Sequence, residues 1–157
     1  MISDDLVRLI EIILKKKYTV SLAESCTGGR IAAIMTDIPG ASEFFLGCAV
    51  TYSNASKEKI LGVPRTILEK HGAVSAETAK AMAHGAKELF GSNIAASATG
   101  IAGPGGGTPS KPVGTVFVAA ADGKRTICER LELKGSRDGI RDAVSENVIR
   151  MLIDIAG

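Results

Sequence analysis

Short strand-forming stretches alternate with helix-forming segments along this chain, and this alternation constrains its fold more than any other feature. Strand-like stretches lie at 18–23, 44–52, 94–98, 113–121 and 125–133. Segments with helical spacing of apolar residues or with capping residues lie at 4–17, 30–37, 55–61, 64–71, 75–90 and 136–155. The last two strands flank the turn Asp122-Gly123-Lys124 and predict a hairpin. Alternating strands and helices predict a layered α/β fold, and the hairpin adds an antiparallel pair, so we expect a mixed sheet.

The composition predicts a single domain, which we place at 1–157. Of the 157 residues, 45% are hydrophobic and 23% are charged, which excludes a disordered chain. The 19 basic and 17 acidic residues leave a net charge of +2, too near neutral for a nucleic-acid-binding protein. No apolar run reaches the roughly 20 residues that span a membrane, and the N-terminus has no signal-peptide pattern. Three cysteines, an odd number, favour the reducing cytoplasm.

Motifs for metals and common cofactors are absent from the sequence. His71 and His84 are too far apart to face each other on one helix, and no short window gathers histidine, cysteine and carboxylate residues at ligand spacing. The glycine-rich segment 103–108 lacks the last glycine of the dinucleotide fingerprint and does not lead into a helix. We therefore expect neither a metal ion nor a cofactor.

The segment 24–29, Glu-Ser-Cys-Thr-Gly-Gly, is the first candidate for chemistry, because it lies between a predicted strand and a predicted helix. A serine there would project from the sheet, and the N–H groups at the helix start could bind an anion or a developing oxyanion. The alternative is that Ser25 is an ordinary helix N-cap and that the glycines serve packing. Cys26 is a rival nucleophile without a partner histidine, and we expect it to be a small buried side chain.

The segment 51–57 is the second candidate. Tyr52 ends an apolar strand and Lys57 begins the next helix, so both would lie at the carboxyl edge of the sheet, where open α/β sheets bind ligands. A lysine whose pKa is lowered by burial can act as a general base. The alternative is a solvated helix lysine beside Glu58 and Lys59.

The loop 99–112 follows the third predicted strand at the same edge and contains five glycines and three prolines. It offers the Thr99 hydroxyl and several free N–H groups to a ligand, although a loop of this composition can also be a disordered connection.

The start of the last predicted helix carries two arginines, Arg137 and Arg141, one turn apart. Together they could bind a phosphate. Asp138 and Asp142 alternate with them, so a surface ladder of ion pairs is an equal alternative.

Five segments in this order resemble the CinA C-terminal domain family, over about residues 4–155. They are 23–29 (AESCTGG), 50–54 (VTYSN) with Lys57, 71–75 (HGAVS), 99–104 (TGIAGP) and 111–116 (KPVGTV). The N-terminal domain of CinA has no counterpart here, so the resemblance is to the stand-alone form. It implies a three-layer α/β/α sandwich with a mixed, mostly parallel sheet. It also implies an amidohydrolase that converts nicotinamide mononucleotide to nicotinic acid mononucleotide and ammonia, feeding pyridine-nucleotide recycling.

The resemblance also implies roles for individual residues. Ser25 matches the nucleophile, Tyr52 and Lys57 match the activating pair, and Thr99 matches a further catalytic position. We expect substrate contacts from Cys26, Thr27, Gly28, Gly29, Gly100, Gly103, Arg137 and Arg141. Two alternatives stay open: a non-catalytic nucleotide-binding module that regulates a partner, and a hydrolase of another nucleotide or amide. We expect a small-molecule nucleotide as the partner, no nucleic acid or membrane, and a homo-oligomer, with a dimer as the first choice.

Overall fold

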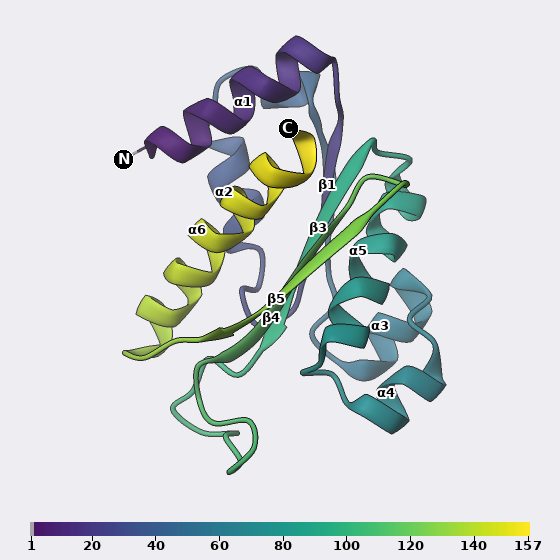
Figure 1. Cartoon of the computed structure of the whole chain (residues 1–157), viewed down its shortest axis with the longest axis vertical. Coiled ribbons are helices and arrows are strands. Elements are labelled where there is room, and N and C mark those ends of the chain that lie inside the picture. The colour runs from purple at the N-terminus through teal and green to yellow at the C-terminus, as the bar shows by residue number, and fades with distance from the viewer. Residues whose placement is uncertain (1) are drawn as a thin grey trace.

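The computed structural model describes residues 2–157, and a five-stranded sheet forms its centre (Figure 1). The strands are β1 (Val20–Glu24), β2 (Phe45–Val50), β3 (Ile94–Gly100), β4 (Thr115–Ala121) and β5 (Thr126–Glu132). The helices are α1 (Asp4–Lys16), α2 (Arg30–Thr36), α3 (Asn54–Leu61), α4 (Arg65–His71), α5 (Ala76–Phe90) and α6 (Arg137–Ala156), with a short 3-10 helix at Ala41–Glu43. Every predicted strand and helix is present, with boundaries that shift by a few residues.

The sheet has the order β2-β1-β3-β4-β5. β1 pairs in parallel with both β2 and β3, whereas β4 is antiparallel to β3 and to β5. Four strands therefore run in one direction and β4 runs against them, which confirms a mixed, mostly parallel sheet. The hairpin predicted at 122–124 joins β4 to β5.

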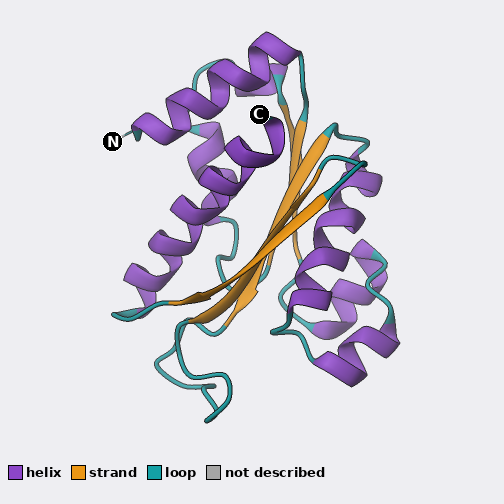
Figure 2. Cartoon of the chain, in the orientation of Figure 1, coloured by secondary structure: helices purple, strands orange, loops and turns teal. Residues whose placement is uncertain are grey.

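Helices cover both faces of the sheet, so the fold is the three-layer α/β/α sandwich that the resemblance implied. Helices α1, α2 and α6 lie on one face, and α3, α4 and α5 lie on the other (Figure 2). The larger core lies under α1, α2 and α6, where side chains such as Leu9, Leu22 and Leu152 are fully buried. Smaller clusters lie under α5, where alanines of β3 and β4 let that helix approach the sheet closely.

Serine side chains begin four of the helices, as local sequence predicts. Each serine accepts a hydrogen bond from the N–H three residues later and so satisfies one of the donors that a helix start leaves unpaired. These caps are Ser3 for α1, Ser53 for α3, Ser75 for α5 and Ser136 for α6.

Parallel pairing brings the carboxyl ends of three strands to one edge of the sheet. Glu24 of β1 is in register with Val50 of β2 on one side and with Ala98 of β3 on the other. The residues that follow, Ser25, Thr51 and Thr99, are therefore neighbours, although they are far apart in sequence. No helix within residues 2–157 has both the length and the apolar character needed to cross a membrane.

Candidate active site

A buried serine–lysine pair lies at this edge of the sheet. Ser25 is 7% exposed and Lys57 only 1% exposed. The Lys57 Nζ atom lies 2.9 Å from Ser25 Oγ, 2.7 Å from the carbonyl oxygen of Thr51 and 3.2 Å from that of Tyr52. The Ser53 cap starts α3 at Asn54, shortly after β2 ends at Val50, and so places Lys57 in the first turn of α3, beside the end of the sheet. The alternative of a solvated lysine is therefore wrong.

Burial also changes the acidity of this lysine. Loss of hydration disfavours the ammonium form and lowers the pKa of Lys57 from 10.5 to about 8. A neutral amine has two N–H donors and one lone pair, which matches the three neighbours of Nζ. The two carbonyls of Thr51 and Tyr52 accept the N–H donors, and the lone pair can then accept the proton of Ser25. The geometry is that of a general base beside a nucleophile.

The N–H groups beside Ser25 divide into two sets. The buried carboxylate of Glu24 accepts from the N–H groups of Gly29 (2.9 Å), Ile31 (3.3 Å) and Ala32 (2.8 Å). The expectation that the helix start is free to bind an anion is therefore wrong, because Glu24 already occupies it. The motif contains this glutamate, but nothing local in the sequence indicates that its side chain turns back to cap the helix.

The N–H groups of Cys26 and Thr27 are buried in the turn and unpaired within the described residues. None of the hydrogen bonds formed among residues 2–157 uses either of them as a donor. They follow the nucleophile directly, which is the place of oxyanion donors in acyl-transfer sites. The Ser25 N–H itself donates to the carbonyl of Ala98 at 3.0 Å, so Ser25 is part of the sheet edge and is not the N-cap of α2.

The two glycines of the motif shape the turn. Gly28 and Gly29 have φ values of +59° and +99°, in the left-handed region that residues with a side chain rarely adopt. Gly29 is the N-cap of α2, and its N–H points to Glu24. The expected substrate contact of Gly29 through its N–H is therefore wrong, and the structure gives both glycines a conformational role.

Cys26 and Thr27 are buried within the turn. Burial raises the pKa of the Cys26 thiol to about 11, so it stays protonated, as expected of a small buried side chain and not of a nucleophile. The Thr27 hydroxyl, like that of Thr51, is fully buried and has no hydrogen-bond partner among residues 2–157. As whole residues, Cys26 is 5% exposed and Thr27 is 0% exposed, so neither side chain is open to a substrate. Their unpaired N–H groups are the donors that remain.

Thr99 and Gly100 belong to β3 and not to the loop where we expected them. The Thr99 hydroxyl donates to the carbonyl of Ala73 at 2.8 Å, so its proton is not directed at an oxyanion. A Cβ atom at Gly100 would lie 2.6 Å from Val116 Cα, so this glycine lets β3 and β4 approach each other. The following loop is also ordered, since Ile101 and Gly114 close it by hydrogen bonds at 2.8–2.9 Å.

Tyr52 does not hydrogen-bond to Lys57 through its phenol, although the two residues were expected to form the activating pair. Its side chain is 63% exposed, and its phenol accepts a hydrogen bond from Arg137 Nη2 at 3.3 Å. It holds Lys57 through its backbone carbonyl and not through the phenol. Arg137 Nη1 also donates to the Gly103 carbonyl at 2.6 Å, so Tyr52, Arg137 and Gly103 meet at the rim near the buried pair. The Arg137 side chain is exposed at this rim.

Arg141 is directed elsewhere. Its Nε atom donates to the carbonyl of Cys26 (3.1 Å) and its Nη2 atom to that of Thr27 (2.8 Å). The expected paired binding of phosphate by Arg137 and Arg141 is therefore wrong, because Arg141 faces the serine turn. The alternative, a ladder of ion pairs within α6, is present only in part, since Arg141 Nη1 lies 3.8 Å from Asp138 Oδ1. Both aspartates, Asp138 at 3.3 Å and Asp142 at 2.8 Å, pair chiefly with Arg30 of α2.

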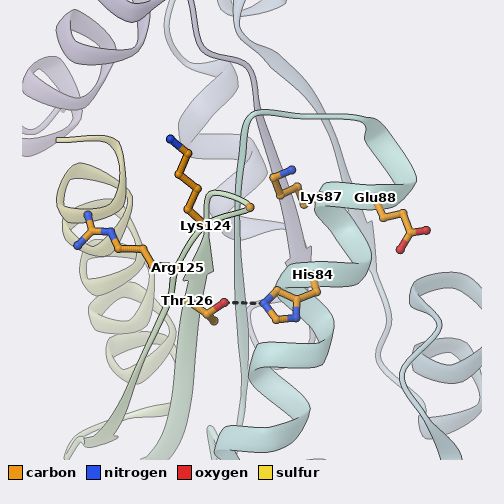
Figure 3. A pocket seen from close by; sticks show the side chains of 7 residues that line it. His84, Lys87, Glu88, Lys124, Arg125 and Thr126 are labelled. Atoms are coloured by element: carbon orange, nitrogen blue, oxygen red, sulfur yellow. Dashed lines mark hydrogen bonds between the residues drawn. The ribbon is translucent and has the colours of Figure 1, made fainter.

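A hollow of about 480 Å³ lies at the opposite edge of the sheet, between α5 and the hairpin of β4 and β5 (Figure 3). His84 Nε2 lies 2.6 Å from Thr126 Oγ1 there, with Lys87 and Glu88 beside them (Figure 3). In the described part of the chain, no group of three or more His, Cys, Asp or Glu side chains could hold a metal ion.

These features define an α/β sandwich protein with a preformed serine–lysine pair and free N–H donors at the carboxyl edge of its sheet. The chain belongs to the CinA C-terminal domain family, whose model matches residues 5–156, and this confirms the resemblance seen in the sequence.

Individual relatives agree with this assignment. A putative competence-damage inducible protein of Desulforudis audaxviator is 49% identical over 90% of this chain. The chain spans about a third of the length of the curated relatives it matches. A competence/damage inducible protein from Agrobacterium tumefaciens has a crystal structure that matches with a TM-score of 0.93 and 38% identity, covering 100% of this chain and 99% of that one. A CinA superfamily protein from Klebsiella pneumoniae matches with a TM-score of 0.93 and 27% identity, covering 98% and 96%.

Proposed function

We propose that this protein is an amidohydrolase that converts nicotinamide mononucleotide to nicotinic acid mononucleotide and ammonia. The observation that carries the proposal is the 2.9 Å contact between Ser25 Oγ and the Nζ atom of a fully buried lysine. A lysine costs free energy to bury, and its retention next to a serine is typical of a functional site. The resemblance to the CinA C-terminal domain family supplies the substrate.

The reaction begins with attack of Ser25 Oγ on the carboxamide carbon of the substrate. A C–O bond forms while the hydroxyl proton passes to the neutral amine of Lys57, and negative charge develops on the amide oxygen. The N–H groups of Cys26 and Thr27 donate to that oxygen. Lys57 then returns the proton to the amide nitrogen, the C–N bond breaks, and ammonia leaves with an acyl-serine remaining. Water attacks the acyl-serine with Lys57 again accepting the proton. Lys57 then returns that proton to Ser25 Oγ as the bond from the acyl carbon to Oγ breaks, which releases the carboxylic acid and restores Ser25.

The chemistry of this substrate class suits a serine nucleophile with a neutral lysine base. Amides are poor electrophiles, but a cationic pyridinium ring withdraws electrons from the attached carboxamide and makes it easier to attack. The same positive charge disfavours protonation of Lys57, which helps to keep the base neutral. The exposed guanidinium of Arg137 at the rim can bind the phosphate of the nucleotide. We further propose that the reaction takes place in the cytoplasm, consistent with three free cysteines, and in a homo-oligomer.

The test is ammonia release by the purified protein from nicotinamide mononucleotide, nicotinamide riboside and nicotinamide. We expect release from the mononucleotide, weaker release from the riboside, and loss of release in Ser25→Ala. Cys26→Ala is the matched control, since it changes the adjacent side chain without removing a reacting group. Binding of the mononucleotide without ammonia release would contradict the proposal and favour the regulatory nucleotide-binding module.

A further inference from the structure

The Arg141 side chain crosses from α6 to the turn that carries the nucleophile. Its two hydrogen bonds end on consecutive carbonyls, those of Cys26 (3.1 Å) and Thr27 (2.8 Å), which are 115 and 114 residues away in sequence. The side chain is only 22% exposed. A Cβ atom at Gly28 would lie 3.2 Å from Arg141 Nη2, so the glycine at this position leaves room for the guanidinium. The contact is therefore built into the packing of the turn.

Each of the two available N–H donors belongs to a peptide unit whose carbonyl is itself held. The Cys26 N–H shares its peptide with the Ser25 carbonyl, which accepts from the Gly28 N–H at 3.1 Å. The Thr27 N–H shares its peptide with the Cys26 carbonyl, and Arg141 is the group that donates to that oxygen. A cation on a carbonyl oxygen fixes the direction of the peptide and draws electrons from its N–H, which makes that N–H a stronger donor.

We propose that Arg141 is a positioning residue that orients and polarises the Thr27 N–H for the oxyanion of the reaction. This inference rests on the proposed function, because it concerns the step in which negative charge develops beside Ser25. Arg141 acts through the peptide backbone and does not touch the substrate. Its effect belongs to the transition state, where the oxyanion exists, and not to the ground-state complex.

Arg30 offers a matched control for Arg141. It also contacts α6, through Asp138 at 3.3 Å and Asp142 at 2.8 Å, and its side chain has a similar exposure of 25%. The Arg30 side chain makes no hydrogen bond to the carbonyls of Cys26 or Thr27. The backbone N–H of Arg30 donates to the Thr27 carbonyl at 3.1 Å, and a side-chain substitution keeps that bond. Arg30→Gln therefore weakens the attachment of α6 and leaves the serine turn unchanged. Arg141→Gln weakens the attachment of α6 and also removes two hydrogen bonds from the serine turn.

The experiment compares wild type, Arg141→Gln, Arg141→Lys and Arg30→Gln. Two rates are measured: turnover of nicotinamide mononucleotide, and covalent labelling of Ser25 by an alkyl fluorophosphonate, whose trigonal-bipyramidal transition state also places an anionic oxygen beside the serine. We expect Arg141→Gln to lower kcat by about 100-fold, near the loss seen when one oxyanion donor is removed, with KM within about twofold. Labelling should slow in parallel. Arg141→Lys, which retains the charge but has one donor group, should fall between, and Arg30→Gln should match wild type.

Three results would overturn the inference. A rise in KM at unchanged kcat would make Arg141 a substrate-binding residue. Equal labelling of wild type and Arg141→Gln would remove the link to the oxyanion, and an equal loss in Arg30→Gln would assign the effect to general loosening of α6. Labelling of wild type without ammonia release would overturn the proposed substrate alone, since the labelling rates still decide the role of Arg141. If Arg141→Gln does not fold, the kcat and the labelling rate of Arg141→Lys are compared with those of Arg30→Gln, and this comparison decides the same question.

Discussion

Replacing Lys57 with arginine is expected to abolish turnover as completely as replacing it with alanine. The contact to Ser25 requires a group that can give up a proton at working pH. Burial lowers the pKa of Lys57 from 10.5 to about 8, so about one molecule in ten has the neutral amine at pH 7. A guanidinium keeps its proton in proteins, so fewer than about one in 10⁵ would be neutral. Both variants therefore lose the base, a loss of about 10²–10⁴-fold in kcat.

The assay is ammonia release between pH 6 and pH 10 for wild type, Lys57→Arg, Lys57→Ala and Lys57→Met. Methionine is the size control, because it nearly preserves the side-chain volume without the charge. For wild type, kcat/KM should rise about tenfold per pH unit below pH 8 and then level off, since the neutral base is the active form. None of the variants should show this inflection. Thermal unfolding of each variant shows whether it is folded before rates are compared.

Near-wild-type turnover in Lys57→Arg would refute the reasoning. Lys57 would then be a phosphate anchor, and Ser25 would have no identified activator. A wild-type rate that falls as pH rises through 8 would also refute it, because the base would then be active in its protonated form.

Four further predictions follow from the same site. Because the folded pKa of Lys57 lies below the unfolded value, the unfolded chain binds more protons between pH 8 and 10.5, and the free energy of unfolding should rise across that window by up to about 3 kcal/mol, as urea titrations can measure. Lys57→Met should remove that rise. Ser25→Ala should lose about 10⁴-fold or more in kcat with nucleotide binding retained by calorimetry, whereas Cys26→Ala should keep most activity; a dead Cys26→Ala with an active Ser25→Ala would reverse the assignment. Turnover should survive EDTA, and restoration of lost activity by a divalent ion would contradict this. Arg137→Ala should raise KM for the mononucleotide at least tenfold while leaving the riboside unaffected, and equal effects on both would exclude a phosphate contact.

Local sequence was sufficient for the elements and for the position of the candidate site. Helix starts depend on one side chain and an N–H three residues later, so Ser3, Ser53, Ser75 and Ser136 could be predicted as caps or as the starts of helices. The carboxyl ends of neighbouring parallel strands share an edge, so Ser25, Lys57 and Thr99 could be expected near one another without coordinates.

The chemical state of these residues was decided only by the tertiary structure. A buried and a solvated lysine have the same local sequence, and Lys57 has a lowered pKa because α3 packs it against the ends of β1 and β2. Local sequence did not predict the hydrogen-bond partners either. Glu24 caps α2, Tyr52 holds Lys57 through its backbone carbonyl, and Arg141 reaches a turn 115 residues away. Burial and side-chain direction depend on how elements distant in sequence pack together, and the spacing of residues within one segment does not determine that packing.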